Sequence, residues 1–188
     1  MRLAHVVLRT PQLEIMRDWY ALVLGADVVY ENAQGCFLTF DEEHHRIALI
    51  CDPHATAIDR AQAGLDHIAF AFASLDELIG RFEQLAAADV HPIWEVDHGP
   101  TTSLYYRDPD DNRVELQIDN FDSPDETAAY FRSEAFNENP VGETIEFRNL
   151  VAHHRAAHPM PVDCLSWYWA STYSSAVGSS DGRTPPIN

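Results

Sequence analysis

The sequence of 188 residues contains no lysine, so all 12 of its cationic side chains are arginine, against 30 acidic side chains. The resulting formal net charge of −18 repels the phosphates of nucleic acids and of anionic lipids. It also disfavours polyanionic substrates, although a local arginine could still bind one carboxylate. We therefore expect neither a nucleic acid nor a membrane among the partners.

Long apolar runs and clustered cysteines are also absent. No run approaches the roughly 18 apolar residues of a membrane span, and no basic, apolar leader is present. Cys36, Cys51 and Cys164 are odd in number and lack a CxxC spacing, so we expect free thiols rather than a disulfide framework or a zinc site. These absences favour a cytoplasmic protein.

An internal repeat organises most of the chain. Each unit reads as a strand, a helix and three further strands, and the second unit follows the first at a constant offset. We interpret residues 1–56 and 62–120 as two tandem βαβββ modules of one α+β domain that spans residues 1–150. The positions that match without a gap include Leu3 and Leu65, His5 and His67, Leu13 and Leu75, Tyr20 and Phe82, and Val28 and Val90.

Capping residues predict where the helices of the repeat begin. Thr10, followed by Pro11, indicates the start of the first helix, and Gly25 its end. Ser74 and Glu77 have the spacing of a capping box at the start of the second helix.

The C-terminal third of the chain carries weaker signals. Ser123, Pro124 and Glu126 predict a helix over about residues 123–137 that packs on the sheet or on a partner subunit. Residues 151–188 become rich in glycine, serine and proline but include the aromatic stretch WYWASTY. We expect either a flexible tail or a dimer contact there, and a homodimer or larger homo-oligomer overall.

The two histidines that open the modules are the first candidates for a functional site. His5 and His67 occupy equivalent positions, which indicates either a shared metal-ligand role or inheritance without function. Glu115, on the last strand of the second module, can add an anionic oxygen, whereas the first module has Ala48 at that position. Two histidines and one carboxylate leave coordination positions open and suit Fe(II), with Mn(II) as the alternative.

A predicted hairpin between residues 98 and 117 carries further candidates. The turn DPDDN separates the strands SLYYR and RVELQID, in which polar and apolar residues alternate. Tyr105 shares a face with polar neighbours, which allows either a catalytic or a packing role, whereas Tyr106 is expected to pack. His45 is a candidate base because its ordinary pKa lies near neutrality and it is expected to share a strand face with Ile47 and Leu49. His44 is expected to point the other way.

The stretches AHVVL, EEHHRIAL, GLDHIAF and HGPTTSLYYRDPDDNRVELQIDNF resemble the vicinal oxygen chelate superfamily, within it the short one-domain type I extradiol dioxygenases. The resemblance covers roughly residues 3–140 and implies a glyoxalase-like half-open barrel. It implies a non-heme iron enzyme that cleaves the ring of a catechol such as biphenyl-2,3-diol and inserts both atoms of O₂. The roles that it implies are metal ligands for His5, His67 and Glu115, acid/base catalysis for His45, and hydrogen bonds to the diol for His98 and Tyr105.

Two departures from the family pattern stand in the predicted hairpin. Asp111 replaces the glycine of the usual DPxGN turn, and only seven residues separate His98 from Tyr105. Two other functions remain open. One is a Mn(II)-dependent fosfomycin-type thiol transferase, which a chain without lysine disfavours, and the other is a non-enzymatic bleomycin-resistance-like binding protein, which would need no metal triplet.

Overall fold

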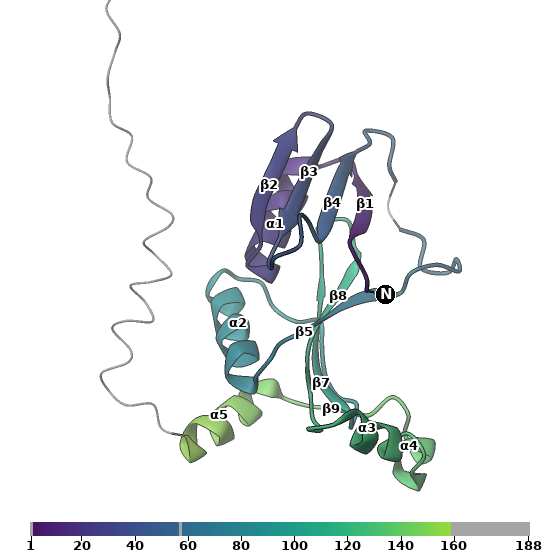
Figure 1. Ribbon diagram of the computed structural model, residues 1–188, viewed down its shortest axis with the longest axis vertical. Helices are drawn as coiled ribbons and strands as arrows, with labels where there is room; N and C mark the ends of the chain where they lie inside the picture. The colour runs from purple at the N-terminus through teal and green to yellow at the C-terminus, as the bar shows by residue number, and fades with distance from the viewer. Residues whose placement is uncertain (1, 57, 159–188) are drawn as a thin grey trace, which may run out of the picture. The chain divides into compact units, whose positions relative to one another are not determined.

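The computed structural model describes residues 2–56 and 58–158, and it divides the chain into a compact unit that ends at Glu146 and a second unit that begins at Phe147. The first unit contains two mixed sheets with helices, which confirms the α+β class (Figure 1). The second unit contributes the helix α5 (Phe147–Ala157). No helix in the described part of the chain is long and apolar enough to cross a membrane.

The first sheet has the strand order β1-β4-β3-β2 and is packed against α1 (Leu13–Leu24). Met16, Tyr20 and Val23 of α1 are fully buried, and the helix ends at Gly25 in the left-handed conformation, as predicted. The strands are β1 (Val6–Thr10), β2 (Asp27–Asn32), β3 (Gly35–Thr39) and β4 (Ile47–Cys51).

The second sheet has the order β5-β8-β7-β6-β9 and carries α2 (Leu75–Ala87) on one face. The predicted capping box is confirmed, because the Ser74 side chain accepts a hydrogen bond from the Glu77 amide and the Glu77 carboxylate accepts one from the Ala73 amide. The strands are β5 (His67–Ala71), β6 (Trp94–Asp97), β7 (Thr101–Arg107), β8 (Arg113–Asp119) and β9 (Glu143–Thr144).

Strand register confirms the internal repeat. β1 runs parallel to β4 with Val7 opposite Ala48, and β5 runs parallel to β8 with Ala69 opposite Glu115. Ala48 and Glu115 therefore occupy equivalent positions in the two modules, as the sequence alignment predicts. Each sheet is open, so the described residues form no closed barrel.

A buried polar contact joins the two modules. The Tyr20 hydroxyl on α1 donates to Asp108 Oδ2 in the β7–β8 turn over 3.0 Å. Asp108 also accepts from the amides of Asp110 and Asn112 and from Asn112 Nδ2. Asp111 has a φ of 70°, so it takes the left-handed position where the usual turn has glycine.

Two helix predictions need correction. The first helix begins at Leu13 without a side-chain cap, because the Thr10 hydroxyl instead accepts from the Gln12 amide in a short turn. The predicted helix over residues 123–137 is divided into α3 (Pro124–Tyr130) and α4 (Glu134–Glu138), because Ser133 caps a new helix. The expected boundary at residue 150 lies inside α5, and residues 159–188 of the predicted tail lie outside the described residues.

Candidate functional site

His67 and Glu115 meet on the face of the second sheet that is opposite α2. His67 opens β5, Glu115 lies on the neighbouring β8, and His67 Nε2 is 2.9 Å from Glu115 Oε2. Only 4% of Glu115 is exposed, and a buried carboxylate requires a positive or hydrogen-bonding partner. His67 Nδ1 contacts Asp66 Oδ2 at 2.8 Å, so Nδ1 carries a proton.

This arrangement fits a metal ligand. Histidines that bind metals commonly donate their other ring N–H to a carboxylate, which fixes the ring and makes the free nitrogen a better ligand. Asp66 provides that carboxylate, and Arg113 contacts Asp66 at 3.3 Å. His67 and Glu115 together have the donor types that suit Fe(II) or Mn(II).

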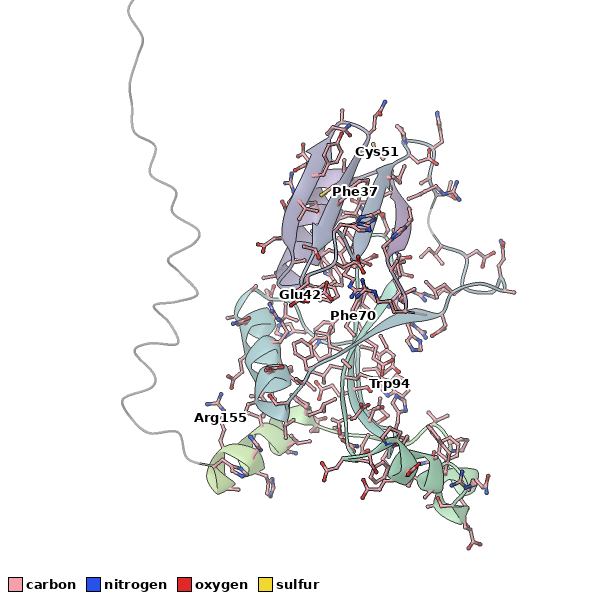
Figure 2. The ribbon with its side chains drawn as sticks, viewed as in Figure 1. Phe37, Glu42, Cys51, Phe70, Trp94 and Arg155 are labelled. Atoms are coloured by element: carbon pink, nitrogen blue, oxygen red, sulfur yellow. The ribbon has the colours of Figure 1, made fainter. Side chains whose placement is uncertain are left out.

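Tyr105 lies directly opposite Glu115 on β7 and is almost fully buried. Its ring packs edge-on against His67, with centroids 5.3 Å apart, and stacks on Trp94 of β6 at 4.9 Å (Figure 2 labels Trp94). Burial first, and then the charge and hydrogen bond of Glu115, raise the pKa of Tyr105 far above its ordinary value. Its hydroxyl therefore stays protonated at neutral pH and acts as a hydrogen-bond donor.

His98 follows β6 and extends the polar row. Its Nε2 is 3.0 Å from the Tyr105 hydroxyl, and its Nδ1 contacts the main-chain carbonyl of Val141. Asn120 Nδ2 donates to Asp97 Oδ1 and to the Gly99 carbonyl, which braces the turn on both sides of His98. Thus His67, Glu115, Tyr105 and His98 form one connected polar row on the second sheet.

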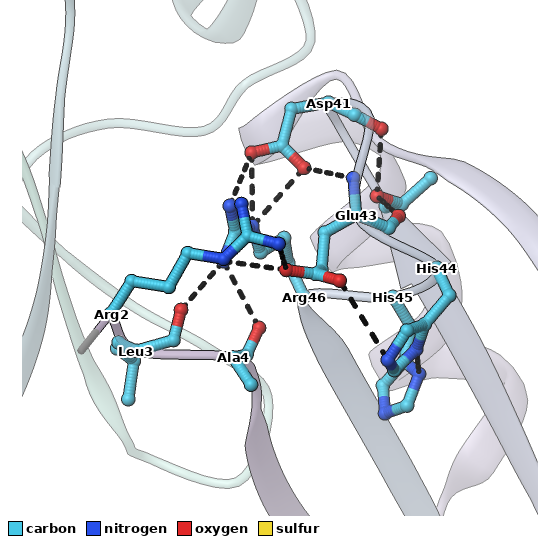
Figure 3. A network of polar contacts seen from close by, with 9 residues as sticks. Arg2, Leu3, Ala4, Asp41, Glu43, His44, His45 and Arg46 are labelled. Carbon is cyan, nitrogen blue, oxygen red and sulfur yellow. Dashed lines mark hydrogen bonds and ion pairs between the residues drawn. The ribbon is translucent and has the colours of Figure 1, made fainter.

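A second cluster forms in the first module around the loop that precedes β4 (Figure 3). The Arg46 guanidinium donates to the carbonyls of Leu3 and Ala4, and Asp41 holds it with both carboxylate oxygens. This clamp fixes the main chain immediately before His5. The His5 and His45 rings are in contact, with centroids 4.4 Å apart.

The prediction that His45 lies on a strand face with Ile47 and Leu49 is wrong, because β4 begins only at Ile47 and His45 lies in the irregular segment before it. The His45 ring stacks on Phe37 instead, at 4.8 Å, and Phe37 is paired with Ala48. The apolar wall is present, but β3 provides it. His44 does not point away, because its Nδ1 is 2.6 Å from that of His45.

The structure therefore brings the predicted residues together in two groups. One contains His67, Glu115, Tyr105 and His98, and the other contains His5 and His45. Within residues 2–56 and 58–158, no three His, Cys, Asp or Glu side chains are gathered closely enough to hold a metal ion. His5 accordingly does not complete a three-residue group with His67 and Glu115, and its ligand role stays a prediction.

Several contacts of the site escaped sequence analysis. The pair of adjacent residues Asp66 and His67 was a usable signal, since neighbouring side chains can contact each other directly. The stacking of Trp94 on Tyr105 depends on strand register, and the contact between His98 and Val141 joins residues 43 positions apart. Tyr106 is fully buried on the opposite face, which confirms its packing role.

Comparisons with known proteins agree with this architecture. A family model described as the Glyoxalase/Bleomycin resistance protein/Dioxygenase superfamily matches residues 2–116. The chain is 46% identical over 173 residues to biphenyl-2,3-diol 1,2-dioxygenase 2 of Rhodococcus globerulus, covering 90% of this chain and 89% of that protein. It is 49% identical over 160 residues to biphenyl-2,3-diol 1,2-dioxygenase 3 of the same organism, covering 84% of each.

Solved structures show the same fold at low sequence identity. A glyoxylase/bleomycin resistance protein/dioxygenase domain from Frankia sp. EAN1pec is 22% identical with a TM-score of 0.55, covering 65% of this chain and 95% of that chain. A glyoxalase/dioxygenase from Nostoc punctiforme is 14% identical with a TM-score of 0.55, covering 64% and 92% respectively.

Proposed function

Because the chain belongs to the glyoxalase/bleomycin resistance protein/dioxygenase superfamily, we propose that it is a metal-dependent extradiol dioxygenase that opens the ring of a catechol-type aromatic diol. Its similarity to two biphenyl-2,3-diol 1,2-dioxygenases, at 46% and 49% identity over most of both chains, supports this reaction class. The reaction inserts both atoms of O₂ into the diol.

The observation in the structure that carries the proposal is the contact between His67 Nε2 and Glu115 Oε2, with Asp66 on the other nitrogen of His67. We infer that His67 and Glu115 bind the metal and that His5 provides the third ligand. The ligand set favours Fe(II), with Mn(II) as the alternative. When bound, such a cation would hold the two diol oxygens and lower the pKa of the diol.

The remaining residues have roles that follow from their chemistry. His45, stacked on Phe37, is the acid/base group, because imidazole exchanges protons near neutral pH and the aromatic wall limits the access of water. The Tyr105 hydroxyl, which is protonated at neutral pH, donates a hydrogen bond to a diol oxygen. His98 hydrogen-bonds the same diol through Nε2, which accepts when the ring is neutral.

The test is anaerobic reconstitution of the purified chain with Fe(II), followed by O₂ and a panel of catechols. We expect a coloured ring-opened product and the consumption of equal amounts of O₂ and diol. Glu115→Gln should lose both bound iron and product, whereas Glu138→Gln, at an exposed glutamate that ends α4, should retain both. Iron-loaded protein that leaves every catechol intact would refute the proposal.

A further inference from the structure

The contact between His98 and Val141 determines which nitrogen of His98 can exchange a proton. A main-chain carbonyl has no proton to give, so the contact between His98 Nδ1 and the Val141 oxygen exists only when Nδ1 carries the hydrogen. In the neutral ring, Nε2 then has a free lone pair. That lone pair faces the Tyr105 hydroxyl at 3.0 Å.

We propose that the main-chain carbonyl of Val141 is a positioning group that holds the proton on His98 Nδ1 and makes Nε2 the nitrogen that exchanges protons with the site. The inference deepens the proposed function and rests on it for its catalytic consequence. The hydrogen bond made by one ring nitrogen sets the protonation state of the other, which is how such a carbonyl acts.

Strand pairing holds the segment that contains Val141 next to β6. Val96 pairs with Thr144 and Asp97 with Glu143, so β9 is in register with β6, the strand that ends just before His98. Trp94 Nε1 also donates to the Thr144 hydroxyl at 3.2 Å. The position of the Val141 carbonyl relative to His98 is therefore fixed by strand pairing.

Asn139 and Gly142 shape the turn itself. Asn139 Nδ2 donates to the Gly142 carbonyl, and the Gly142 amide donates to Asn139 Oδ1. Gly142 has a φ of 90°, and a Cβ there would overlap the main chain of Asp97 and His98. Only glycine lets the turn approach His98 this closely.

Proton exchange at Nε2 fits the chemistry of its neighbour. The Tyr105 hydroxyl can either donate its proton to His98 Nε2 or accept a hydrogen bond from it. In the first case His98 is neutral, and in the second Nε2 must itself donate, so the ring is charged. In both states the Val141 carbonyl keeps Nδ1 protonated, so only Nε2 changes.

Long-range ¹H–¹⁵N correlation spectra of the ¹⁵N-histidine-labelled full-length protein, taken where the ring is neutral, distinguish the two tautomers. The signal of His98 is assigned by its loss in His98→Gln. We expect a protonated Nδ1 and a bare Nε2 in the unsubstituted protein. A protonated Nε2 with a bare Nδ1 would overturn the proposal.

Two substitutions in the turn test the cause. Gly142→Ala forces the turn away from His98, and Asn139→Ala loosens it more gently, so both should increase the fraction with a proton on Nε2. Asn137→Ala, at an exposed amide of the preceding α4, is the matched control and should leave the tautomer unchanged. An unchanged tautomer in a folded Gly142→Ala protein would overturn the proposal even if Asn139→Ala failed to fold.

The turnover rates of the same variants test whether the tautomer of His98 affects the reaction. The rate at saturating diol should fall in proportion to the fraction of His98 left in the Nδ1–H form, because only that fraction is competent. Unchanged turnover despite a changed tautomer would refute the catalytic consequence. Absence of ring cleavage in the unsubstituted protein would refute the proposed function instead, and the spectra would still decide whether Val141 sets the tautomer.

Discussion

The buried contact between Tyr20 and Asp108 makes a quantitative prediction about stability. Tyr20 is fully buried, and its hydroxyl donates to a carboxylate that is itself buried in the β7–β8 turn. Tyr20→Phe removes this donor and leaves the aromatic ring in place. A hydrogen bond to a charged acceptor contributes about 1.5–3 kcal/mol to the free energy of unfolding.

The other hydrogen bonds of Asp108 decide where in that range the loss should lie. The carboxylate keeps three donors from Asp110 and Asn112, so it is not left unpaired. We therefore expect a loss of about 2 kcal/mol. In a domain of this size, that corresponds to a fall in Tm of about 4–8 °C.

The pH dependence of this loss has a defined sign. Burial raises the pKa of Asp108 above its ordinary value, although its hydrogen bonds oppose that shift. Because the pKa is raised in the folded state, ionised Asp108 lowers the free energy of unfolding at neutral pH, and this loss disappears as the pH falls and Asp108 becomes protonated. Tyr20→Phe raises the pKa further, so its effect should be largest at neutral pH and smaller in acid.

Urea unfolding followed by circular dichroism measures both effects. Tyr30→Phe is the matched control, because Tyr30 is 51% exposed and its hydroxyl accepts a hydrogen bond from the side-chain Nδ2 of Asn32. It should change the free energy of unfolding by less than about 0.5 kcal/mol. A Tyr20→Phe protein as stable as the unsubstituted chain, with the same m value, would refute the reasoning.

Four further predictions follow from the site and its surroundings. His45→Gln should retain iron and bind the diol while turnover falls by about 10²–10⁴-fold, whereas Glu115→Ala should lose the iron itself. Iron analysis and single-turnover kinetics distinguish the two variants. An iron-poor His45→Gln protein would contradict the acid/base role of His45. The hydrogen bond from Arg46 lowers the pKa of Asp41, so ionised Asp41 stabilises the fold above the ordinary carboxyl pKa, and this stabilisation is lost as the pH falls through the lowered pKa. The Asp41→Asn protein should thus unfold more readily than the unsubstituted chain at neutral pH but not in strong acid. An equal loss in the free energy of unfolding at both pH values would contradict this. Burial raises the pKa of Cys36 to about 11, so a thiol reagent should modify it only after unfolding, and rapid labelling of the native protein would be inconsistent with its burial. Light scattering at micromolar concentration should show a homodimer or larger assembly, and a monomer would contradict the expectation.

Local signals in the sequence were sufficient for much of the fold. The helices of the two modules begin at Leu13 and Leu75, which preserves the repeat offset. Hydrophobic spacing and side-chain capping act within a few residues, so their effects are visible without coordinates. The same locality explains the error at Thr10, whose hydroxyl had more than one nearby amide available to it.

The repeat also allowed part of the site to be predicted. Equivalent positions of two duplicated modules fall at the same level of their sheets, so the sequence alignment of Ala48 with Glu115 predicts their equivalent register. The placement of His67 beside Glu115 follows from the same strand pairing. The contact of Asp66 with His67 needed only their adjacency in the chain.

Tertiary structure decided what depends on distant segments and on irregular backbone. His45 lies in the irregular backbone before β4 and stacks on Phe37, a result that strand alternation cannot give because alternation holds only inside a regular strand. Nothing local to His98 reveals that a carbonyl 43 residues later contacts its Nδ1. The sequence by itself therefore determined the repeat, its helices and the rung that bears Glu115, whereas the orientation of both His45 and His98 was decided by contacts that exist only after the strands and loops have packed.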